Sequence, residues 1–203
     1  FGLVDAQTIN FQDTKGELTV DGSGSANYKV PIALPPGIKD VAPQIALVYN
    51  SSGSNGVAGY GWNIAGVSSI NRIGTRKDLD GIIKPINFDD SDQFALDGQR
   101  LIKQSDNSLK TENYSNLKIV VNNGNLTSPD YFIVYSADGS ISYYGNVQNS
   151  KGVAEWLITK WIDTNGNTIK YDYVSNSNVI NLSKITWSEN EKKTTNFQNT
   201  MEF

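Results

Sequence analysis

The acidic residues around position 80 are the first candidates for chemistry in this sequence. Asp78 and Asp80 flank a leucine and stand directly before Gly81, which gives the D-x-D-G spacing of a calcium loop. Calcium takes about six to eight oxygen ligands, and short Asp-rich turns can supply several of them. The rest of the EF-hand pattern is missing, because no third ligand and no closing glutamate follow at the required spacing. A simple turn is the favoured interpretation, and a calcium site at Asp78 and Asp80 is the alternative.

A glycine-rich stretch, NGVAGYGWNIAGVSSINR at residues 55–72, is the second candidate, as a phosphate-binding loop. Gly59 and Gly61 begin a G-x-G-x-x-G pattern, but Ile64 occupies its last position. No helical pattern follows, so the free amides and helix dipole that hold a pyrophosphate are missing too. We therefore expect no nucleotide here, and we expect Gly59 and Gly61 to allow a bulge or the close approach of another backbone.

The same stretch has the residues of a corner between strands. Asn55 and Gly56 form an Asn-Gly pair, which favours a two-residue hairpin turn. Trp62 would anchor the corner by burying a large apolar ring. A strand over residues 67–73 would then leave the corner, with Arg72 at its polar end. The sequence predicts a structural corner where a ligand loop was the first candidate.

The sequence contains no cysteine and no histidine. Thiol catalysis, Ser-His-Asp triads and the usual zinc sites are therefore impossible within this chain. Most aspartates stand in turns, where this side chain commonly bonds its own backbone, so no catalytic carboxylate pair is evident. We predict that the chain is not an enzyme and needs no cofactor. An acid hydrolase with two facing carboxylates is the rival.

Charge and hydropathy argue against two classes of partner. The net charge is -4 and no basic patch is visible, which disfavours nucleic acids and anionic membrane surfaces. No apolar run approaches the roughly 20 residues that a membrane-spanning helix needs. We expect neither nucleic-acid binding nor membrane insertion.

Aromatic side chains offer a further class of function, a sugar-stacking platform. The candidates are Tyr143, Tyr144, Trp156, Trp161, Tyr171 and Tyr173. Aromatic residues at strand spacing more often pack in a core or across strands, so core packing is favoured. An adhesive or carbohydrate-binding surface domain remains the alternative function.

The elements that must position these residues are strands. Apolar residues alternate with polar ones in NYKVPIAL, QIALVYN and TIKYDYV, which is typical of strands with one buried face. Turn signals separate such runs, as PPG at 35–37 and as Asn-Gly or Asp-Gly pairs at 55–56, 80–81, 97–98, 123–124, 138–139 and 165–166. Short polar pieces near 5–13 and 189–199 are the best helix candidates, and neither has an apolar stripe. The sequence predicts an all-β fold of antiparallel, hairpin-rich sheets, with the polar stretch 104–116 as its weakest seam.

The segment 22–72 resembles the opening of the SpvB-type N-terminal domain, which is found in Salmonella virulence plasmid B proteins and in B components of insecticidal toxin complexes. The shared features are a Gly/Ser-rich lead, a P-I-x-x-P-P-G turn, a P-x-L-x-L-x-Y-x-S strand and a G-x-G-W-x-L-x-G-x-S-x-I-x-R corner. Two isoleucines, Ile45 and Ile64, replace leucines that are common in the family. The matching positions are Pro31, Ile32, Pro35, Pro36, Gly37, Pro43, Tyr49, Ser51, Gly59, Gly61, Trp62, Gly66, Ser68, Ile70 and Arg72.

Later segments resemble the same family in the same order. They are DQFALDGQRLI, LKTENYSNLKIV, DYFIVYSADGSISYYGN and KITWSEN. WLITKWIDTNGNTIKYDY resembles an Rhs or YD-type strand pair, with Asp163, Gly166 and Asn167 at its D-x-x-G-N positions. Residues 1–16 are loosely patterned and are expected to form an extended arm. The resemblance implies an SpvB-like β-domain over 17–203. YD-repeat-like strands would begin near 156 and continue past Phe203.

The family resemblance implies an architectural role. It implies a non-catalytic module of an exported bacterial protein, forming part of a hollow Rhs/YD-type β-shell that encloses or presents a C-terminal toxin. The expected partners are the rest of the same polypeptide and its enclosed C-terminal cargo, with other toxin-complex subunits or secretion machinery as further partners. The catalytic toxin is a separate module in that family, so no catalytic residue carries over. The expected location is secreted or on the bacterial cell surface.

Overall fold

The computed structural model describes residues 15–145, 154–176, 179–193 and 199–203. The chain forms two compact units, one from residues up to Ala33 together with Gln44–Gly66, and one from Leu34–Pro43 together with Val67–Phe203. The arm expected over residues 1–16 and the helix candidate near 5–13 lie almost wholly outside the described residues. The polar stretch 104–116 is not a division between units, because it contributes a strand to the second one.

The first unit is a small antiparallel sheet. Its strands run in the order β1-β2-β3-β6, and a separate two-stranded ribbon joins β4 and β5. The register places Leu18, Tyr28, Tyr49 and Trp62 opposite one another in one row across the sheet. The bounds are β1 (Glu17–Val20), β2 (Ala26–Pro31), β3 (Ala46–Asn50), β4 (Asn55–Gly56), β5 (Gly59–Tyr60) and β6 (Trp62–Ala65).

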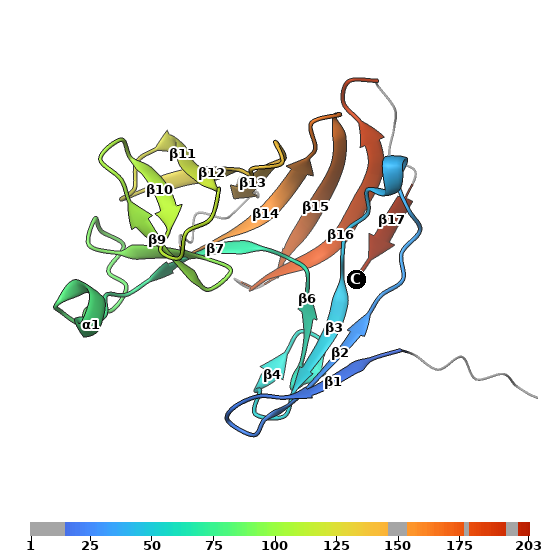
Figure 1. The fold of residues 1–203 in the computed structure, drawn as a ribbon, viewed down its shortest axis with the longest axis horizontal. Helices are drawn as coiled ribbons and strands as arrows, with labels where there is room; N and C mark the ends of the chain where they lie inside the picture. Colours follow the sequence, from blue (N-terminus) through green and yellow to red (C-terminus); the bar gives the residue numbers. More distant parts are fainter. Residues whose placement is uncertain (1–14, 146–153, 177–178, 194–198) are drawn as a thin grey trace, which may run out of the picture. The chain divides into compact units, whose positions relative to one another are not determined.

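The second unit is built on a closed barrel (Figure 1). Neighbouring strands from β7 to β13 pair in antiparallel order, and β14 pairs with both β13 and β7, which closes the ring. The bounds are β7 (Ser69–Ile73), β8 (Gln93–Leu96), β9 (Gln99–Lys103), β10 (Ser108–Thr111), β11 (Lys118–Gly124), β12 (Pro129–Tyr135), β13 (Ile141–Gly145) and β14 (Glu155–Ile162).

An open sheet extends from the barrel at β14. The strands β15 (Asn167–Asn176), β16 (Val179–Asn190) and β17 (Asn199–Glu202) follow β14 in antiparallel order. A short 3-10 helix, η1 (Ile38–Asp40), contacts β16, and a single helical turn, α1 (Lys77–Asp80), lies between β7 and β8. The predicted all-β, antiparallel and hairpin-rich fold is confirmed.

The barrel core consists of alternate side chains from its strands. Each of the following is at most 1% exposed: Ile70, Phe94, Leu101, Leu109, Ile119, Phe132 and Trp156. The rings of Phe94, Phe132 and Trp156 form a mutually contacting trio, with centroids 5.0 to 5.8 Å apart. Alternation along β12 shows the principle, since Phe132 and Val134 are buried while their neighbours are not. Period-two patterning therefore fills the barrel as sequence alternation predicts.

Three of the predicted turns are confirmed. The pairs at 97–98, 138–139 and 165–166 connect β8 to β9, β12 to β13 and β14 to β15. In the second of these, the carboxylate of Asp138 accepts hydrogen bonds from the backbone and side chain of Ser140. This capping of the turn by its own aspartate is the physical reason that Asp-Gly is so reliable a signal.

Three other predicted turns are wrong. Asn55-Gly56 forms β4, and the chain turns at the next two residues instead. Asp80-Gly81 ends α1, with Gly81 as its left-handed C-cap. The pair at 123–124 lies inside β11, which turns only after it. At these three positions, hydrogen bonds of a strand or of a helix end override the local preference of the dipeptide for a turn. The helix candidate near 189–199 is also wrong where it is described, because β16 runs to Asn190 and β17 begins at Asn199.

No helix in the described part of the chain is long and apolar enough to cross a membrane.

Candidate functional site

A buried ion pair joins the start and the end of the long β7–β8 connection. The Nη1 atom of Arg72 lies 3.1 Å from Oδ2 of Asp92, and these side chains are 0% and 1% exposed. Asp92 also accepts hydrogen bonds from the backbone N–H groups of Asn87 (2.9 Å) and Phe88 (2.7 Å). The Nη2 atom of Arg72 donates to the carbonyl of Thr127 at 2.6 Å. One charged pair thus holds two loops of the barrel.

Aromatic rings surround the guanidinium of Arg72. Its Cζ atom lies 5.3 Å from the ring centroid of Phe94, 5.5 Å from that of Trp156 and 5.8 Å from that of Phe88. Such positions favour cation–π attraction, which is strongest where water is excluded. Arg72 does lie near the end of its strand, β7, as predicted, but the expected polar surroundings are wrong. Arg72 lies in the core, and its charge is balanced there by Asp92 and the rings.

The proline-rich segment before η1 is bound to the open sheet. The carbonyl of Pro35 accepts a 3.1 Å hydrogen bond from Nε1 of Trp187 on β16, and the carbonyl of Pro36 accepts one of 3.3 Å from Asn199 on β17. Gly37 allows the close approach, because a Cβ atom there would lie 2.9 Å from Cδ1 of Trp187. We call residues 34–43 the strap. It ties a segment near the start of the chain to strands near its end.

A network of amides and one carboxylate fixes the β14–β15 hairpin. Asp163 accepts hydrogen bonds from the backbone N–H groups of Asn165 and Asn167 and, at 2.8 Å, from the Asn167 side chain. Asn190 of β16 donates to the Asn167 side chain at 2.8 Å, and both of these amides are at most 2% exposed. Burial acts to raise the pKa of Asp163, but hydrogen bonds from Asn167 and Asn165 outweigh it and the pKa is lowered. The carboxylate is thus an ionised acceptor at neutral pH.

This network brings together the three residues of the YD-like pattern. Gly166 completes the turn by accepting a backbone hydrogen bond from Glu191, while Asp163 and Asn167 make the contacts above. Asn190, which the sequence reading did not single out, connects this hairpin to β16. The only sequence feature that pointed to Asn190 was its place at the end of the family-like segment KITWSEN.

The glycine-rich corner is a structural turn in the first unit. Gly61 has φ +76°, and a Cβ atom there would lie 2.6 Å from the ring of Tyr49. Trp62 stands next to it in a tilted contact with Tyr49, with ring centroids 5.3 Å apart, and in an edge contact with Tyr28. Trp62 is only half-buried, so its predicted burial is incomplete. Gly59 lies in β5, away from any side chain that a Cβ would meet.

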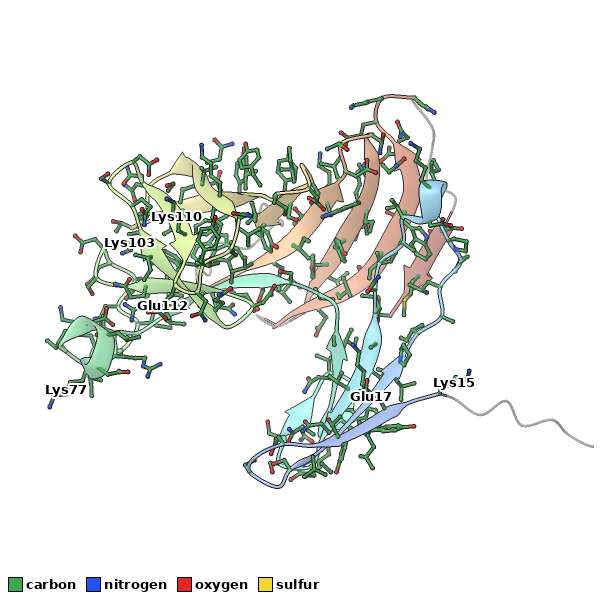
Figure 2. All side chains as sticks on the ribbon, viewed as in Figure 1. Lys15, Glu17, Lys77, Lys103, Lys110 and Glu112 are labelled. Carbon is green, nitrogen blue, oxygen red and sulfur yellow. The ribbon has the colours of Figure 1, made fainter. Side chains whose placement is uncertain are left out.

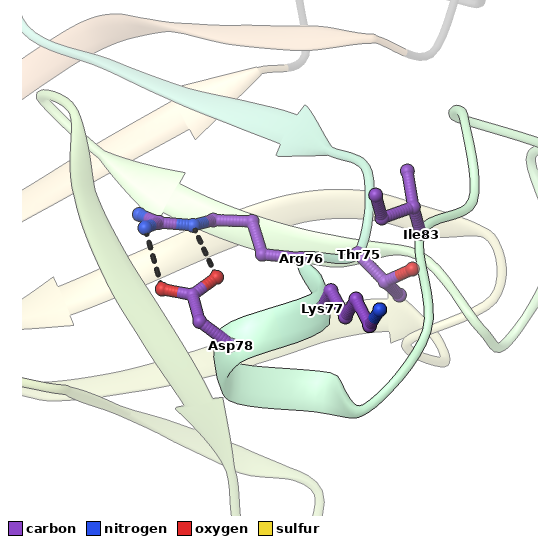
Figure 3. A pocket seen from close by; sticks show the side chains of 5 residues that line it. All are labelled: Thr75, Arg76, Lys77, Asp78 and Ile83. Carbon is purple, nitrogen blue, oxygen red and sulfur yellow. Dashed lines mark hydrogen bonds and ion pairs between the residues drawn. The ribbon is translucent and has the colours of Figure 1, made fainter.

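The proposed calcium carboxylates are each paired with arginine. Asp78 accepts two hydrogen bonds from the guanidinium of Arg76, at 2.7 and 3.1 Å (Figure 3). Asp80 pairs with Arg100, and that hydrogen bond lowers the pKa of the Asp80 carboxyl. Beside Asp78 lies an open depression of about 480 Å³ that Thr75, Lys77 and Ile83 also line. Within the described residues, no group of three or more acidic, His or Cys side chains could hold a metal ion.

The aromatic residues considered as a sugar platform mostly pack inside the fold. Trp156 is 1% exposed and belongs to the barrel core. Tyr144 and Tyr171 are buried as well, and burial raises the pKa of Tyr171 to about 12. Tyr173 donates its hydroxyl to the carbonyl of Ile158 at 2.7 Å. Core packing, the interpretation that residue spacing favoured, is therefore confirmed for these rings.

Two residues central to this arrangement were not recognised from sequence. No sequence pattern marked Asp92 as a charge partner, although it balances the buried Arg72. Trp187 lies in the family-like segment KITWSEN, and its ring is fully buried and binds the strap. The available signal was alternation, because Ile185 and Trp187 are two residues apart and therefore share one face of the strand.

The sequence of residues 20–136 matches the family model described as Salmonella virulence plasmid 65kDa B protein, SpvB. No curated protein sequence matches the chain.

Solved structures with the same fold come from toxin complexes and from an effector. A crystal structure of TcdB2-TccC3 is similar at 19% identity and TM-score 0.66, over 86% of this chain and 10% of that one. A Photorhabdus luminescens Tc holotoxin pore is similar at 17% identity and TM-score 0.65, and the match covers 90% of this chain and 11% of that one. The N-terminal domain of effector protein SpvB from Salmonella typhimurium strain LT2 is similar at 21% identity and TM-score 0.61. That match covers 86% of this chain and 71% of that one. The chain spans about a tenth of the toxin-complex chains, and at these identities the likeness concerns the fold.

Proposed function

The chain belongs to the SpvB family, and we propose that it serves as a non-catalytic structural module of an exported, toxin-complex-like bacterial protein. In this proposal the module forms part of a hollow Rhs/YD-type β-shell that encloses or presents a C-terminal toxin or effector. The family assignment and the similarity to toxin-complex structures support the proposal.

The open sheet that extends from a closed barrel is the observation that carries this proposal. The barrel completes its own hydrogen bonding around the ring, whereas β15, β16 and β17 run outward as a sheet with β17 at its edge (Figure 1). The strap and the Asp163–Asn167–Asn190 network hold this sheet in place. An edge of this kind can be covered by further strands of a wall, which would also protect it from aggregation.

The use of the charged residues supports a non-catalytic role. Asp92, Asp80 and Asp163 each accept hydrogen bonds that fix a backbone or an arginine. Two depressions of the described surface each include one carboxylate, Asp78 in one and Glu17 in the other. A glycosidase-type hydrolase needs two carboxyls about 5 to 10 Å apart across a cleft, and neither depression supplies that pair.

The partners in this proposal are the remainder of the shell polypeptide and its enclosed C-terminal cargo. Other toxin-complex subunits or secretion machinery would contact the assembled shell, and the product would act outside the bacterial cell or on its surface. Glycan ligands have no part in the proposal, because Tyr144, Trp156 and Tyr171, three of the aromatic residues considered for a sugar platform, are buried.

Protease protection of the complete gene product tests this role. We expect the C-terminal portion to resist a protease while the shell is closed and to be cleaved after Trp187→Ala, which removes a buried ring of β16 that binds the strap. Tyr114→Ala is the matched control, because Tyr114 is 90% exposed. If the C-terminal portion is digested at the same rate in the wild type and in Trp187→Ala, the enclosing role is wrong.

A further inference from the structure

The first unit ends in an open strand edge at β1. β1 pairs with β2 on one side and with no strand of the described chain on the other. All of β1 is exposed, and the side chains of Leu18 and Val20 are each 67% exposed. A bare edge of this kind presents unpaired N–H and C=O groups to any strand that can add to it.

Leu18 is the outermost member of the apolar row across this sheet. It stands opposite Tyr28 on β2, which stands opposite Tyr49 on β3, which stands opposite Trp62 on β6. The ring of Trp62 contacts those of Tyr28 and Tyr49, whereas Leu18, on the edge strand, is exposed to solvent. A strand added at β1 with an apolar residue opposite Leu18 would extend the row and bury that surface.

The sequence of β1 is complementary to itself in antiparallel pairing. If two copies pair about Leu18, then Leu18 meets Leu18, Glu17 meets Thr19, and Lys15 meets Asp21 at both ends. The two members of each pair lie on the same face of the sheet, because this register places even-numbered residues opposite even-numbered ones and odd-numbered residues opposite odd-numbered ones. Lys15 and Glu17 stand at the start of the strand, as Figure 2 shows.

The charges at the two ends are placed for this register. Lys15 is exposed and makes no hydrogen bond or ion pair with another described residue. The carboxylate of Asp21 is held in position by the N–H groups of Ser23 (2.9 Å) and Ser25 (3.0 Å), and it stays open to solvent. A shift of the pairing by two residues would replace the two Lys–Asp contacts and move Leu18 away from its own copy.

We propose that β1 is a self-recognition edge, through which a second copy of this chain adds antiparallel and joins the two small sheets into one. Charge complementarity, the row of apolar residues and the symmetric register select a second copy over an unrelated strand. This interaction surface belongs to the first unit alone and is independent of the enclosing role proposed for the open sheet.

A cysteine placed at the centre of the pairing tests the register directly. The chain contains no cysteine, so Leu18→Cys introduces its only thiol. Residues directly opposite in an antiparallel pair have Cβ atoms about 4.5 to 5.5 Å apart, which small strand adjustments bring within disulfide reach. Under mild oxidation we expect at least a 10-fold faster covalent dimerisation for Leu18→Cys than for the control Val57→Cys, whose parent side chain is 70% exposed in the same unit.

Sedimentation of variants without cysteine completes the test. Lys15→Glu should weaken dimerisation about 10-fold, because it replaces two attractive contacts with two repulsive ones. Thr19→Lys should strengthen it several-fold, because it places a cation opposite Glu17 of the partner. A monomeric wild type at all concentrations, or equal disulfide rates for the two cysteine variants, would overturn the proposal. A dimer that these charge changes leave unaffected would also overturn it, since another surface would then be responsible.

Discussion

The barrel and the small N-terminal sheet use aromatic residues in opposite ways. In the barrel, Phe94, Phe132 and Trp156 are almost completely buried, and the rings of Phe94 and Trp156 lie near the guanidinium of the buried Arg72. In the small sheet, Tyr49 and Trp62 contact each other but remain half-exposed on one face. A closed ring of strands has an inside that excludes water, whereas a single sheet has a face that something else must cover. The same residue types therefore stabilise one region and leave the other open to association.

The largest effect should come from breaking the buried pair. Asp92→Ala leaves the guanidinium of Arg72 buried without its carboxylate and removes the acceptor for two backbone N–H groups. We expect the free energy of unfolding to fall by about 3 to 5 kcal/mol, measured by chemical denaturation. Arg72→Met combined with Asp92→Leu should recover much of that loss, because no unpaired charge then remains. A loss below about 1 kcal/mol for Asp92→Ala would mean that water reaches the pair and that the barrel is not sealed.

Trp62→Ala should be milder than the same change in a full core. Complete burial of a tryptophan predicts a loss of about 3 to 5 kcal/mol, and the half-exposed ring should give about 1 to 2 kcal/mol. Urea denaturation followed by far-ultraviolet circular dichroism measures the difference, with Tyr60→Ala as a control at a site that is 70% exposed. A loss as large as that of Asp92→Ala would show that the apolar face of the small sheet is covered in solution.

A smaller effect should follow from removing one strap contact. Trp187→Phe keeps a buried ring but deletes the N–H group that donates to the carbonyl of Pro35. The net value of such a hydrogen bond is about 1 kcal/mol, and the strap should exchange its amide hydrogens faster in the variant. Hydrogen exchange over residues 34–43 is the readout, and unchanged exchange there would show that the strap is held by packing alone.

The smallest effect should be a dependence of stability on acid pH. The pKa of Asp163 is lower in the folded chain than in the unfolded one, so its contribution is present above about pH 4 and disappears as the pH falls through the folded pKa. Because Asp163 is only half-buried and solvent screens its charge, the effect should stay below about 1 kcal/mol. Thermal melts of the wild type and of Asp163→Asn, compared at pH 7 and pH 3, should converge at the lower pH. A difference that widens on acidification would contradict this sign.

Local sequence signals predicted the fold well where a segment's contacts are with residues close to it in the sequence. Alternation identified strands such as β3 and β15, and the pairs at 138–139 and 165–166 marked hairpins. In both hairpins an aspartate, Asp138 or Asp163, bonds the turn that follows it. Local signals failed where the pairing of nearby residues moved a turn. Asn55-Gly56 looked like a turn, yet both residues pair with β5, and the chain turns at residues 57–58 instead.

The candidate site depended most on distant contacts, so the sequence predicted least of it. The partnership of Arg72 with Asp92 depends on a loop that folds back between the residues, and no spacing rule describes such a loop. The contact between Pro35 and Trp187 joins positions that are 152 residues apart. Family resemblance marked Pro35 and Arg72 as notable, but only the structure shows that one binds a strand and the other is buried in a barrel.

Cryo-electron microscopy of the complete gene product tests the structural role most directly. The account predicts that β14 to β17 continue into further paired strands of a wall and that the wall surrounds a C-terminal segment. Density in which β17 remains a free edge, with the C-terminal segment outside any enclosure, would contradict it.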